Sequence, residues 1–430
     1  MYILIKDVAN YVNQEVTIKG WLYNKRSSGK IAFLELRDGT GFIQAVVVKS
    51  DTNEELWVNV EKTTQESSVI VAGNVTKHPK KEDVYELQVT SYQLLQVADE
   101  YPIALKEHGP DFLLDNRHLW LRSKKQWAIQ RVRDVVIQAI YDFYHEQGFI
   151  KIDTPIITPN ACEGATTLFG IEYFDLGEVF LSQSGQLYLE AAIMSVGRAF
   201  DFGPTFRAEK SKTKRHLTEF WMMDAEAAFV EHEESMHIQE SMICFIVDRC
   251  LQRCAREFEI LERDILPLQK IKMPFIRLTY TQAVQQLQSL GSDIKFGEDL
   301  GNDDEGLLTK DSPVPVFVHK WPKNIKPFYM KEDPDNADLV LNDDLISTEG
   351  AGELIGGSQR EDRYDKLELA IKREGLEGPE YKWYLDLRKY GSVPHSGFGL
   401  GLERTVAWIC GVKHIRETIP FPRLINRVRP

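Results

Sequence analysis

Polar and apolar residues alternate in short runs over the first part of the chain. The runs start at residues 16, 31, 41, 68 and 85, and turns such as Ser27–Lys30 and Arg37–Gly41 separate them. A period of two is typical of strands that bury one face, and closely spaced turns favour short strands. Residues 1–98 are therefore predicted to form a small closed β-barrel.

A longer period replaces this alternation further along the chain. From Gln126 to Phe143 apolar residues recur every three or four positions, and Gly148 follows as a stop, which predicts a helix. Further predicted elements are a strand over 149–159 that Pro155 interrupts, a helix over 231–261, and strands over 314–319 and 323–330. Proline, glycine and charge in residues 99–125 predict a hinge before a third region, residues 126–430.

Residues 204–229 predict a strand, a polar loop and a second strand. Arg207 ends the first strand, and Lys210–His216 form a basic loop that is too polar to pack. Cations at the tip of a hairpin suit a polyanion, because arginine and lysine donate charge-assisted hydrogen bonds to phosphate oxygens. The alternative is a solvated surface hairpin. The acids Glu219, Asp224 and Glu226 favour a functional hairpin over a solvated one. Charged residues in a largely buried strand pair are costly, so we expect them to have a functional role.

The glycines near the carboxyl end predict a second ligand-binding feature. In a strand, Gly397, Gly399 and Gly401 share one face, which stays bare so that a flat ligand can lie on it. Arg404 follows in the first turn of a predicted helix that Gly411 closes. A dinucleotide-binding unit is disfavoured, because no strand–helix–strand pattern follows.

Glu353 lies inside an apolar, glycine-rich strand, where a charge is difficult to place structurally. A carboxylate there suits Mg²⁺, which keeps waters and bridges phosphates through one or two carboxylates. Asp338 is the candidate for a second acid. Pairing of Glu353 with Arg360 is the structural alternative. The clustered acids of residues 296–306 predict a solvated loop rather than a metal site.

Composition limits the class of protein. The 430 residues are 43% hydrophobic and 27% charged, which is ordinary for a globular protein, and no apolar run reaches transmembrane length. The start of the chain lacks a signal-peptide pattern, so we expect a cytoplasmic protein without membrane partners. The formal charge of −13 argues against DNA and non-specific nucleic-acid binding, although a local basic surface can bind RNA. Five cysteines without zinc spacing predict reduced core thiols.

Several of these patterns resemble the signatures of class II aminoacyl-tRNA synthetases. Phe-Arg-x-Glu at 206–209 and Arg-His-x-x-Glu-Phe at 215–220 resemble the second signature, and Gly-Leu-Gly-Leu-Glu-Arg at 399–404 resembles the third. Helix, strand and Pro155 resemble the first, which builds a homodimer interface. The resemblance covers almost the whole chain and is to the aspartate, asparagine and lysine enzymes. It implies an α+β protein, with an amino-terminal OB-fold barrel and a catalytic antiparallel sheet flanked by helices.

The resemblance also implies how ATP and Mg²⁺ would bind. Adenine would lie between Phe220 and Arg404, with Glu209 near its edge, and Arg207 would bridge the substrate carboxylate and the α-phosphate. Arg215, His216 and Arg404 would hold the γ-phosphate, with Mg²⁺ on Glu353. The implied catalytic residues are Arg207, Arg404 and Glu353. The implied ATP-binding residues are Arg207, Glu209, Arg215, His216, Phe220, Gly401 and Arg404, and the metal candidates are Glu353 and Asp338.

An amino-acid pocket is implied as well. Its residues would be Glu163 near the substrate ammonium, Gln186 on the substrate backbone, Asp224 as an acceptor from an amide or ammonium group, Arg388 on the side-chain carbonyl oxygen, and Arg360. Ser184 has a structural alternative as a helix cap. Gly185 and Leu189 replace the proline and lysine of the aspartate enzymes. A neutral carboxamide needs no such lysine, and an unpaired buried lysine is costly, so asparagine is favoured.

In the barrel, Phe33, Gln44 and Glu86 match positions that contact anticodon bases in this family, with Arg26 and Lys25 near the backbone. We therefore expect ATP-dependent ligation of L-asparagine to tRNA through an asparaginyl-adenylate, by a homodimer most like the bacterial asparagine enzymes. Two kinds of alternative stay open. One is an aspartate–tRNA ligase, possibly non-discriminating. The other is a synthetase-derived binding or regulatory protein, or a paralogue that makes asparagine.

Overall fold

The computed structural model describes residues 1–104, 106–163, 168–211 and 213–430. The chain divides into two compact units, Met1–Leu113 and Leu114–Pro430. Each unit buries its own apolar clusters, and the cluster of the first unit shares no residue with those of the second among the described residues. No helix in the described ranges is long and apolar enough to cross a membrane.

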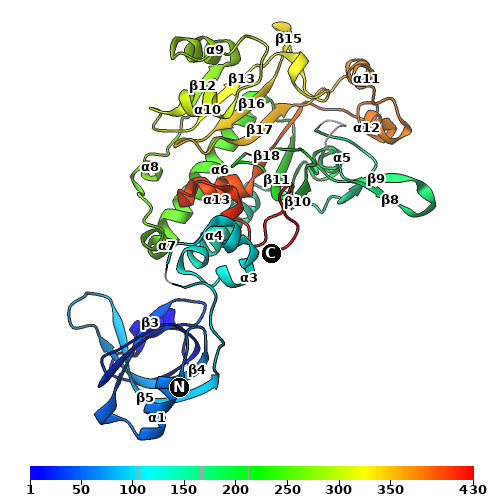
Figure 1. Cartoon of the computed structure of the whole chain (residues 1–430). Helices are drawn as coiled ribbons and strands as arrows, with labels where there is room; N and C mark the ends of the chain where they lie inside the picture. The colour runs from blue at the N-terminus through cyan, green and yellow to red at the C-terminus, as the bar shows by residue number, and fades with distance from the viewer. Residues whose placement is uncertain (105, 164–167, 212) are drawn as a thin grey trace. The chain divides into compact units, whose positions relative to one another are not determined.

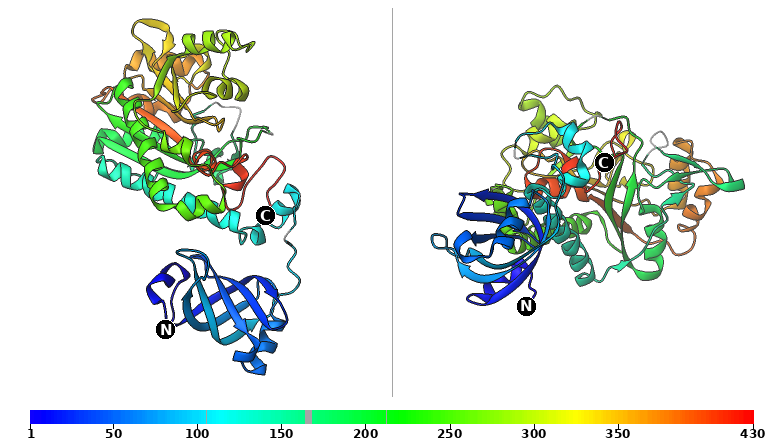
Figure 2. Two further views of the ribbon diagram at one scale, coloured as in Figure 1. Left: turned by 90° about the vertical axis from the view of Figure 1, so that its left-hand side faces the viewer. Right: turned by 60° about the horizontal axis from the view of Figure 1, so that its bottom comes forward.

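The first unit confirms the predicted barrel (Figures 1 and 2). Within residues 1–104, all of which are described, the closed barrel has the strand order β1-β2-β3-β5-β4. The strands are β1 Glu15–Ser27, β2 Ile31–Arg37, β3 Phe42–Val48, β4 Ser68–Lys77 and β5 Tyr85–Gln96, and α1 (Glu54–Lys62) lies between β3 and β4. Buried and part-exposed residues alternate along β2 and β3, as a period of two requires.

The second unit contains a sheet of eight strands within the described residues (Figure 1). Its order is β12 (Ile276–Thr279), β13 (Val316–His319), β16 (Asn342–Ile346), β17 (Glu353–Gln359), β18 (His395–Gly401), β11 (Glu219–Ala228), β10 (Arg198–Phe206) and β6 (Ile150–Lys151). The prediction of an antiparallel sheet holds for the inner pairs. The outer pairs β12–β13 and β10–β6 are parallel, so the sheet is mixed.

The two faces of this sheet differ in character. On β11, Met223 and Ala225 belong to the main apolar cluster, so the period of two places Asp224 and Glu226 on the opposite face. Helices α4 (Lys124–Glu146), α6 (His232–Arg253) and α13 (Leu402–Cys410) pack on this face and supply a large share of that cluster (Figure 1). The buried charges of residues 204–229 thus lie on the face away from the main core.

The remaining elements frame this second face or connect the layers. The helices are α2 Pro110–Asp115, α3 Arg117–Trp120, α5 Gln186–Val196, α7 Ala255–Ile260, α8 Leu266–Gln269, α9 Tyr280–Ser289, α10 Asn302–Thr309, α11 Tyr364–Arg373 and α12 Lys382–Asp386. The short strands are β7 Ile157–Thr158, β8 Gly170–Glu172, β9 Glu178–Leu181, β14 Glu332–Asp333 and β15 Asn336–Val340. All five cysteines are free thiols.

Two local predictions were wrong. Residues 323–330 were expected to form a strand, but Lys323–Ile325 is a 3-10 helix and Met330 makes only an isolated bridge to Arg360. Pro322 and Pro327 flank this turn, and proline has no N–H to donate to a ladder. The acidic stretch 296–306 was expected to be a solvated loop, but it contains the start of α10, whose Glu305 is largely buried.

Candidate active site

The predicted ATP-binding residues line one cavity on the second face of the sheet. Those that face it are Arg207, Glu209, Arg215, His216, Phe220, Gly401 and Arg404, together with the metal candidate Glu353. They come from the loop between β10 and β11, from β11, from β17, from the end of β18 and from α13. The fold thus brings together residues that are almost two hundred positions apart, which supports the grouping made from the sequence. Lys212 of the basic loop lies outside the described residues.

Arginines define the charge of this cavity. The Arg207 guanidinium lies 5.5 Å from the centre of the Phe220 ring, and its Nε is buried with no hydrogen-bond partner in the part of the chain that the structure describes. Arg404 Nη1 donates to the carbonyl oxygen of Glu353 and lies 3.9 Å from Glu353 Oε2. Burial, followed by the charge of Arg404, lowers the pKa of His216, which is therefore neutral near pH 7. Three arginines thus face the cavity, together with the carboxylates Glu209, Glu353 and Glu403.

Arg215 is held by residues from two distant segments. Its Nη1 donates to Glu305 Oε2 at 2.5 Å and to Asn302 Oδ1 at 2.8 Å, and its Nη2 donates to the carbonyl oxygen of Gly350 at 2.5 Å. Burial, and then the nearby Glu353 carboxylate, raise the pKa of Glu305 to about 7. No local pattern pairs this acid with Arg215, because ninety positions separate the two residues.

The glycine stripe of β18 lies under the acids of β11. A Cβ at Gly397 would lie 2.0 Å from Glu226 Oε1, and a Cβ at Gly399 would lie 2.7 Å from Asp224 Oδ1. At Gly401 the nearest atom would be Arg404 Cβ, at 3.9 Å. The stripe was predicted to be bare for a flat ligand. Gly399 and Gly401 both line the cavity, but only at Gly401 would a Cβ have room, while Gly397 and Gly399 leave space for carboxylates.

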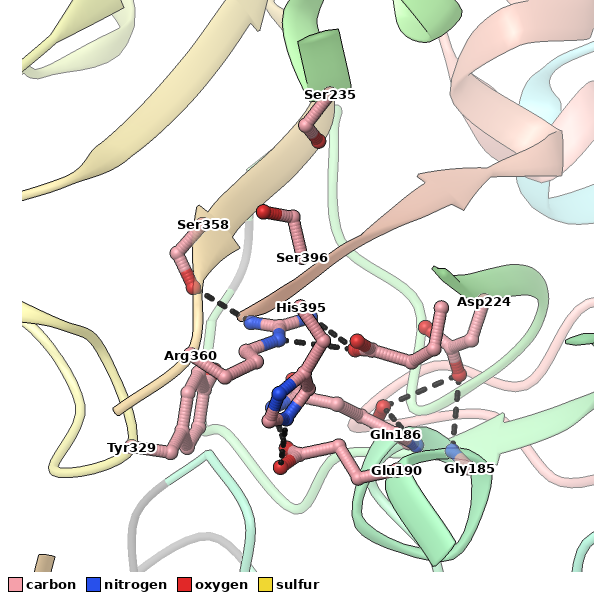
Figure 3. Close-up of polar contacts among 12 residues, drawn as sticks. Gly185, Gln186, Glu190, Asp224, Ser235, Tyr329, Ser358, Arg360, His395 and Ser396 are labelled. Carbon is pink, nitrogen blue, oxygen red and sulfur yellow. Dashed lines mark hydrogen bonds and ion pairs between the residues drawn. The ribbon is translucent and has the colours of Figure 1, made fainter. Parts of the chain in front are cut away.

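Asp224 and α5 form one side of a second, polar space next to this cavity. Asp224 Oδ2 accepts hydrogen bonds from Ser184 Oγ at 3.1 Å and from the Gly185 N–H at 2.9 Å (Figure 3). Ser184 Oγ also accepts from the Gln186 N–H at 3.0 Å, but the N-cap residue of α5 is Gly185 and not Ser184. Burial is the main reason why the pKa of Asp224 rises to about 6. Only Oδ1 of this carboxylate is then left for a ligand.

Arg360 and Glu226 form a buried ion pair on the opposite side of the same space. Arg360 Nε donates to Glu226 Oε1 at 2.9 Å, and its Nη1 donates to Ser358 Oγ at 2.6 Å (Figure 3). Arg360 therefore does not pair with Glu353, the alternative considered from the sequence. Burial raises the pKa of Glu226 to about 7 although Arg360 opposes the rise. Glu226 Oε2 is buried and, within the described ranges, accepts no hydrogen bond.

Arg388 is anchored by Glu190 of α5. Its Nη2 donates to Glu190 Oε2 at 2.6 Å, and Tyr384 Oη donates to Glu190 Oε1 at 2.7 Å. His395 Nε2 lies 3.0 Å from Glu190 Oε2 (Figure 3). Burial alone would raise the pKa of Glu190, but Arg388 and His395 together hold it below its usual range. Arg388 Nη1 is buried and has no hydrogen-bond partner among the residues described.

Glu163 lies where its loop leaves the described part of the chain. Tyr329 Oη donates to Glu163 Oε1 at 2.8 Å, and the N–H of Glu163 donates to Gln183 Oε1 at 3.1 Å. Residues 164–167, which follow Glu163, lie outside the described residues. Tyr329 also lies under Arg360, with 5.1 Å from the guanidinium to the ring centre. Glu163 thus belongs to the same polar space as Arg360.

The two metal candidates are not brought together. Asp338 is exposed on the β14–β15 hairpin and does not line the cavity. Asp344 of β16 is the acid beside Glu353. The two carboxylates flank Gly356, from whose Cβ position Glu353 Oε1 would be 3.1 Å away and Asp344 Oδ1 3.9 Å away. Burial raises the pKa of Asp344 to about 7, Lys326 opposes the rise, and Glu353 adds to it. In the described ranges, no three His, Cys, Asp or Glu residues form a metal cluster.

The predicted anticodon residues share one surface of the barrel. Gln44 and Glu86 are neighbours on the paired strands β3 and β5, and Gln44 Nε2 donates to Glu86 Oε1 at 2.7 Å. Phe33 is half-exposed and lies opposite Arg26 across the β1–β2 pair. Lys25 differs from expectation, because its ammonium donates to the last carbonyls of α1, including Thr63 O at 2.7 Å. Lys25 is thus committed to the barrel itself.

Sequence reasoning assigned no role to four acids of this site, Glu190, Glu226, Glu305 and Asp344. For Glu226 a signal was available, because it lies two positions from Asp224 and so points to the same face of β11. Glu190 lies four positions after Gln186, on the same face of α5. Glu305 and Asp344 gave no such signal, since their partners come from segments that only the tertiary fold brings near.

Comparisons with known proteins agree with this geometry. Residues 109–425 match the family described as tRNA synthetases class II (D, K and N), and residues 16–95 match the OB-fold nucleic acid binding domain. The chain is similar to the asparaginyl-tRNA synthetase from Pyrococcus horikoshii complexed with asparaginyl-adenylate, with 43% identity, a TM-score of 0.96, and coverage of 100% of this chain and 99% of that chain. For the asparaginyl-tRNA synthetase of Entamoeba histolytica the identity is 33%, the TM-score 0.91, and the coverage 100% of both chains. A putative aspartyl-tRNA synthetase from Leishmania major Friedlin is 25% identical, with a TM-score of 0.85 and coverage of 100% of this chain and 95% of that chain.

Proposed function

Because the chain belongs to the class II tRNA synthetases of the aspartate, lysine and asparagine group, we propose that it is an asparagine–tRNA ligase. The asparagine carboxylate attacks the α-phosphorus of ATP, the bond to the β-phosphate breaks, and pyrophosphate leaves. The 3′-terminal hydroxyl of tRNA then takes the acyl group and AMP leaves. Such chemistry needs positioning and charge neutralisation more than a protein nucleophile.

The preference for asparagine rests on one observation. Glu226 Oε2 is buried without a donor in the part of the chain described, beside a space that Arg360 and Arg388 also border. A carboxamide N–H₂ donates to that oxygen while its carbonyl oxygen accepts from an arginine. Aspartate would instead bring a carboxylate against Glu226, and polar mismatch of this kind is worth up to about 10⁴-fold in discrimination. Leu189 is fully buried in an apolar cluster, where a lysine would find no partner.

The other assignments follow from the same space. Arg388 Nη1 is the donor for the side-chain carbonyl oxygen. Asp224 Oδ1, Glu163 and Gln186 receive the substrate ammonium and backbone. Asp224 therefore serves the ammonium rather than the amide, because Glu226 is the acid with an oxygen to spare. Discrimination against aspartate then rests on Glu226.

In the cavity, Arg207 bridges the substrate carboxylate and the α-phosphate, Phe220 and Arg404 hold the adenine, and Glu209 lies near its edge. Arg215, His216 and Arg404 hold the γ-phosphate. The unpartnered Nε of Arg207 supports its role, because a buried guanidinium N–H needs an acceptor. The assignments explain why three arginines share a small cavity.

Mg²⁺ fits the pair Glu353 and Asp344. Glu353 adds to the raised pKa of Asp344, and a cation between these neighbouring carboxylates would relieve that repulsion; two carboxylates with waters and phosphates are a usual magnesium set. When bound, the ion would neutralise phosphate charge. Glu353 would hold it together with Asp344, and Asp338 lies too far out on its hairpin to take part.

The proposal extends to tRNA and to a second copy of the chain. Phe33 stacks on an anticodon base, and Gln44 and Glu86 hydrogen-bond to neighbouring bases. A homodimer is supported by exposed apolar side chains after α4, among them Ile150, Ile156 and Ile157, which are 43–49% exposed. Sedimentation equilibrium tests the dimer, and a monomer at micromolar concentration would contradict it.

Amino-acid-dependent exchange of labelled pyrophosphate into ATP tests the function. We expect exchange with asparagine and at least a thousandfold less with aspartate, followed by charging of asparagine tRNA. Comparable exchange with aspartate would show that the assigned amino-acid specificity is wrong, while the proposed adenylation reaction would stand. The Glu226→Gln variant should narrow the difference between the two amino acids, because it removes the charge that repels aspartate. Folded protein that exchanges with neither amino acid would overturn the proposal.

A further inference from the structure

Glu305 lies outside every sequence signature, yet its side chain contacts Arg215, which is predicted to bind the γ-phosphate of ATP. Its side chain is 14% exposed and its Oε2 lies 2.5 Å from Arg215 Nη1. The residue belongs to α10, a short helix whose acids were expected to face solvent. A buried carboxylate at hydrogen-bond distance from an arginine of the ATP cavity needs a reason.

The surroundings of the pair are built to keep Arg215 in place. Asn302, one turn earlier on α10, accepts from the same Nη1 at 2.8 Å, and the carbonyl oxygen of Gly350 accepts from Nη2 at 2.5 Å. A Cβ at Gly352 would lie 2.7 Å from Arg215 Nη1 and 2.8 Å from Glu305 Oε2. Gly352 also has a φ of +92°, a conformation that favours glycine. The turn before β17 therefore packs directly on the ion pair.

The pair leaves part of the arginine available. Nη1 gives both of its hydrogens to α10 and Nη2 gives one to Gly350, so Nε–H and the second Nη2–H of Arg215 have no acceptor among the described residues. A guanidinium fixed on one edge presents its other edge as a fork that suits a phosphate. An arginine that is already held in place loses less side-chain entropy when the ligand binds.

We propose that Glu305 is a positioning residue for the nucleotide, which fixes Arg215 so that its free edge points at the phosphate end of the cavity. The inference rests on the proposed function and adds a residue from outside the family signatures. Glu305 acts through Arg215 and does not itself contact ATP. An acid that competed with phosphate for Arg215 would have the opposite effect and would weaken ATP binding. The two effects change the affinity for ATP in opposite directions.

The test compares Glu305→Gln with Asp303→Asn, a matched control that removes one charge from an exposed position of the same helix. We measure KM for ATP and for asparagine by pyrophosphate exchange, and ATP affinity by calorimetry. Glu305→Gln should raise KM for ATP and the calorimetric Kd about tenfold and leave KM for asparagine within twofold. Asp303→Asn should change none of them. An unchanged or lower KM for ATP in Glu305→Gln would overturn the proposal.

A double-mutant cycle separates positioning from a merely structural role. In an Arg215→Ala background, Glu305→Gln should have no further effect on ATP affinity, because its partner is gone. A full tenfold effect in that background would refute action through Arg215. If Glu305→Gln folds poorly, Asn302→Ala removes one hydrogen bond from an exposed residue, and a two- to threefold rise in Kd for ATP is expected. Wild-type protein that binds ATP but exchanges with no amino acid would count against the proposed function, while the calorimetric comparison would still decide the role of Glu305.

Discussion

Replacing Gly397 by alanine gives the sharpest test of the amino-acid pocket. The added Cβ would lie 2.0 Å from Glu226 Oε1 and 2.1 Å from Cδ. Ordinary carbon contacts begin near about 3.5 Å, so the carboxylate must retreat by more than about 1 Å. Its hydrogen bonds with Arg360, one of them 2.9 Å long, cannot survive that movement. The substitution therefore breaks a buried ion pair while both of its residues stay in the sequence.

The expected size follows from the burial of the pair. Arg360 and Glu226 have side-chain exposures of 4% and 0%, and breaking such a pair costs about 3 kcal/mol or more. We expect a comparable loss in the free energy of unfolding. KM for asparagine should rise by about a hundredfold, because every 1.4 kcal/mol is tenfold in affinity. KM for ATP should change little, since the ATP cavity lies at the other end of the glycine stripe.

Gly401→Ala is the matched control on the same strand face. Its Cβ would meet nothing closer than Arg404 Cβ at 3.9 Å, but it would project into the cavity. We expect KM for ATP to rise while KM for asparagine and the midpoint of urea unfolding stay unchanged. Pyrophosphate exchange with each substrate varied in turn measures both variants. A Gly397→Ala protein with normal KM for asparagine would refute the reasoning, as would equal losses in both variants.

Four further outcomes are expected. Among the described residues, Glu190 is the only acid that forms an ion pair with Arg388, and Glu190→Gln removes its charge. The free energy of unfolding measured in urea should fall by about 3 kcal/mol. An unchanged free energy would contradict the assigned ion pair. Asp344→Asn should raise the Mg²⁺ concentration for half-maximal pyrophosphate exchange about tenfold, while Asp338→Asn leaves it unchanged. The reverse ranking would show that Asp338 and not Asp344 is the second metal ligand. Phe33→Ala should raise KM for tRNA about tenfold with normal pyrophosphate exchange, since one stacked base contributes about 1–3 kcal/mol. The pKa of Asp224 is raised to about 6, so the folded state binds the proton of this carboxyl more tightly than the unfolded state does. The contribution of Asp224 to the free energy of unfolding should therefore fall by about 2–3 kcal/mol as the pH rises from 4 to 6. Asp224→Asn should remove this fall from the pH profile of stability.

The sequence was sufficient for elements whose evidence is local. Alternation predicted the barrel strands, and the three-to-four-residue period predicted α4 and α6. One failure also had a local cause. Residues 323–330 have strand-like composition, but the prolines at 322 and 327 withhold donors, and a 3-10 helix forms instead.

The same distinction holds for the site. The arginines of the ATP cavity were predictable because their signatures are short and dense. Asp338 and Asp344 are six positions apart on either side of a strand turn, and only the strand pairing of β16 with β17 decides which one lies beside Glu353. The burial of Glu305 likewise could not be predicted from its position in an acidic stretch. Its partner Arg215 lies ninety positions earlier in the chain, and only the tertiary fold brings the two together.

The separate cores of the two units have an evolutionary consequence. The barrel buries its own apolar cluster, so a substitution on its surface draws on the stability of the barrel and not on that of residues 114–430. Proteins tolerate new mutations only while they stay above a stability threshold. Here the proposed anticodon surface and the proposed amino-acid pocket lie in different units. Each unit therefore has its own stability threshold. Changes in codon recognition can therefore accumulate without eroding the mutational tolerance of the catalytic unit.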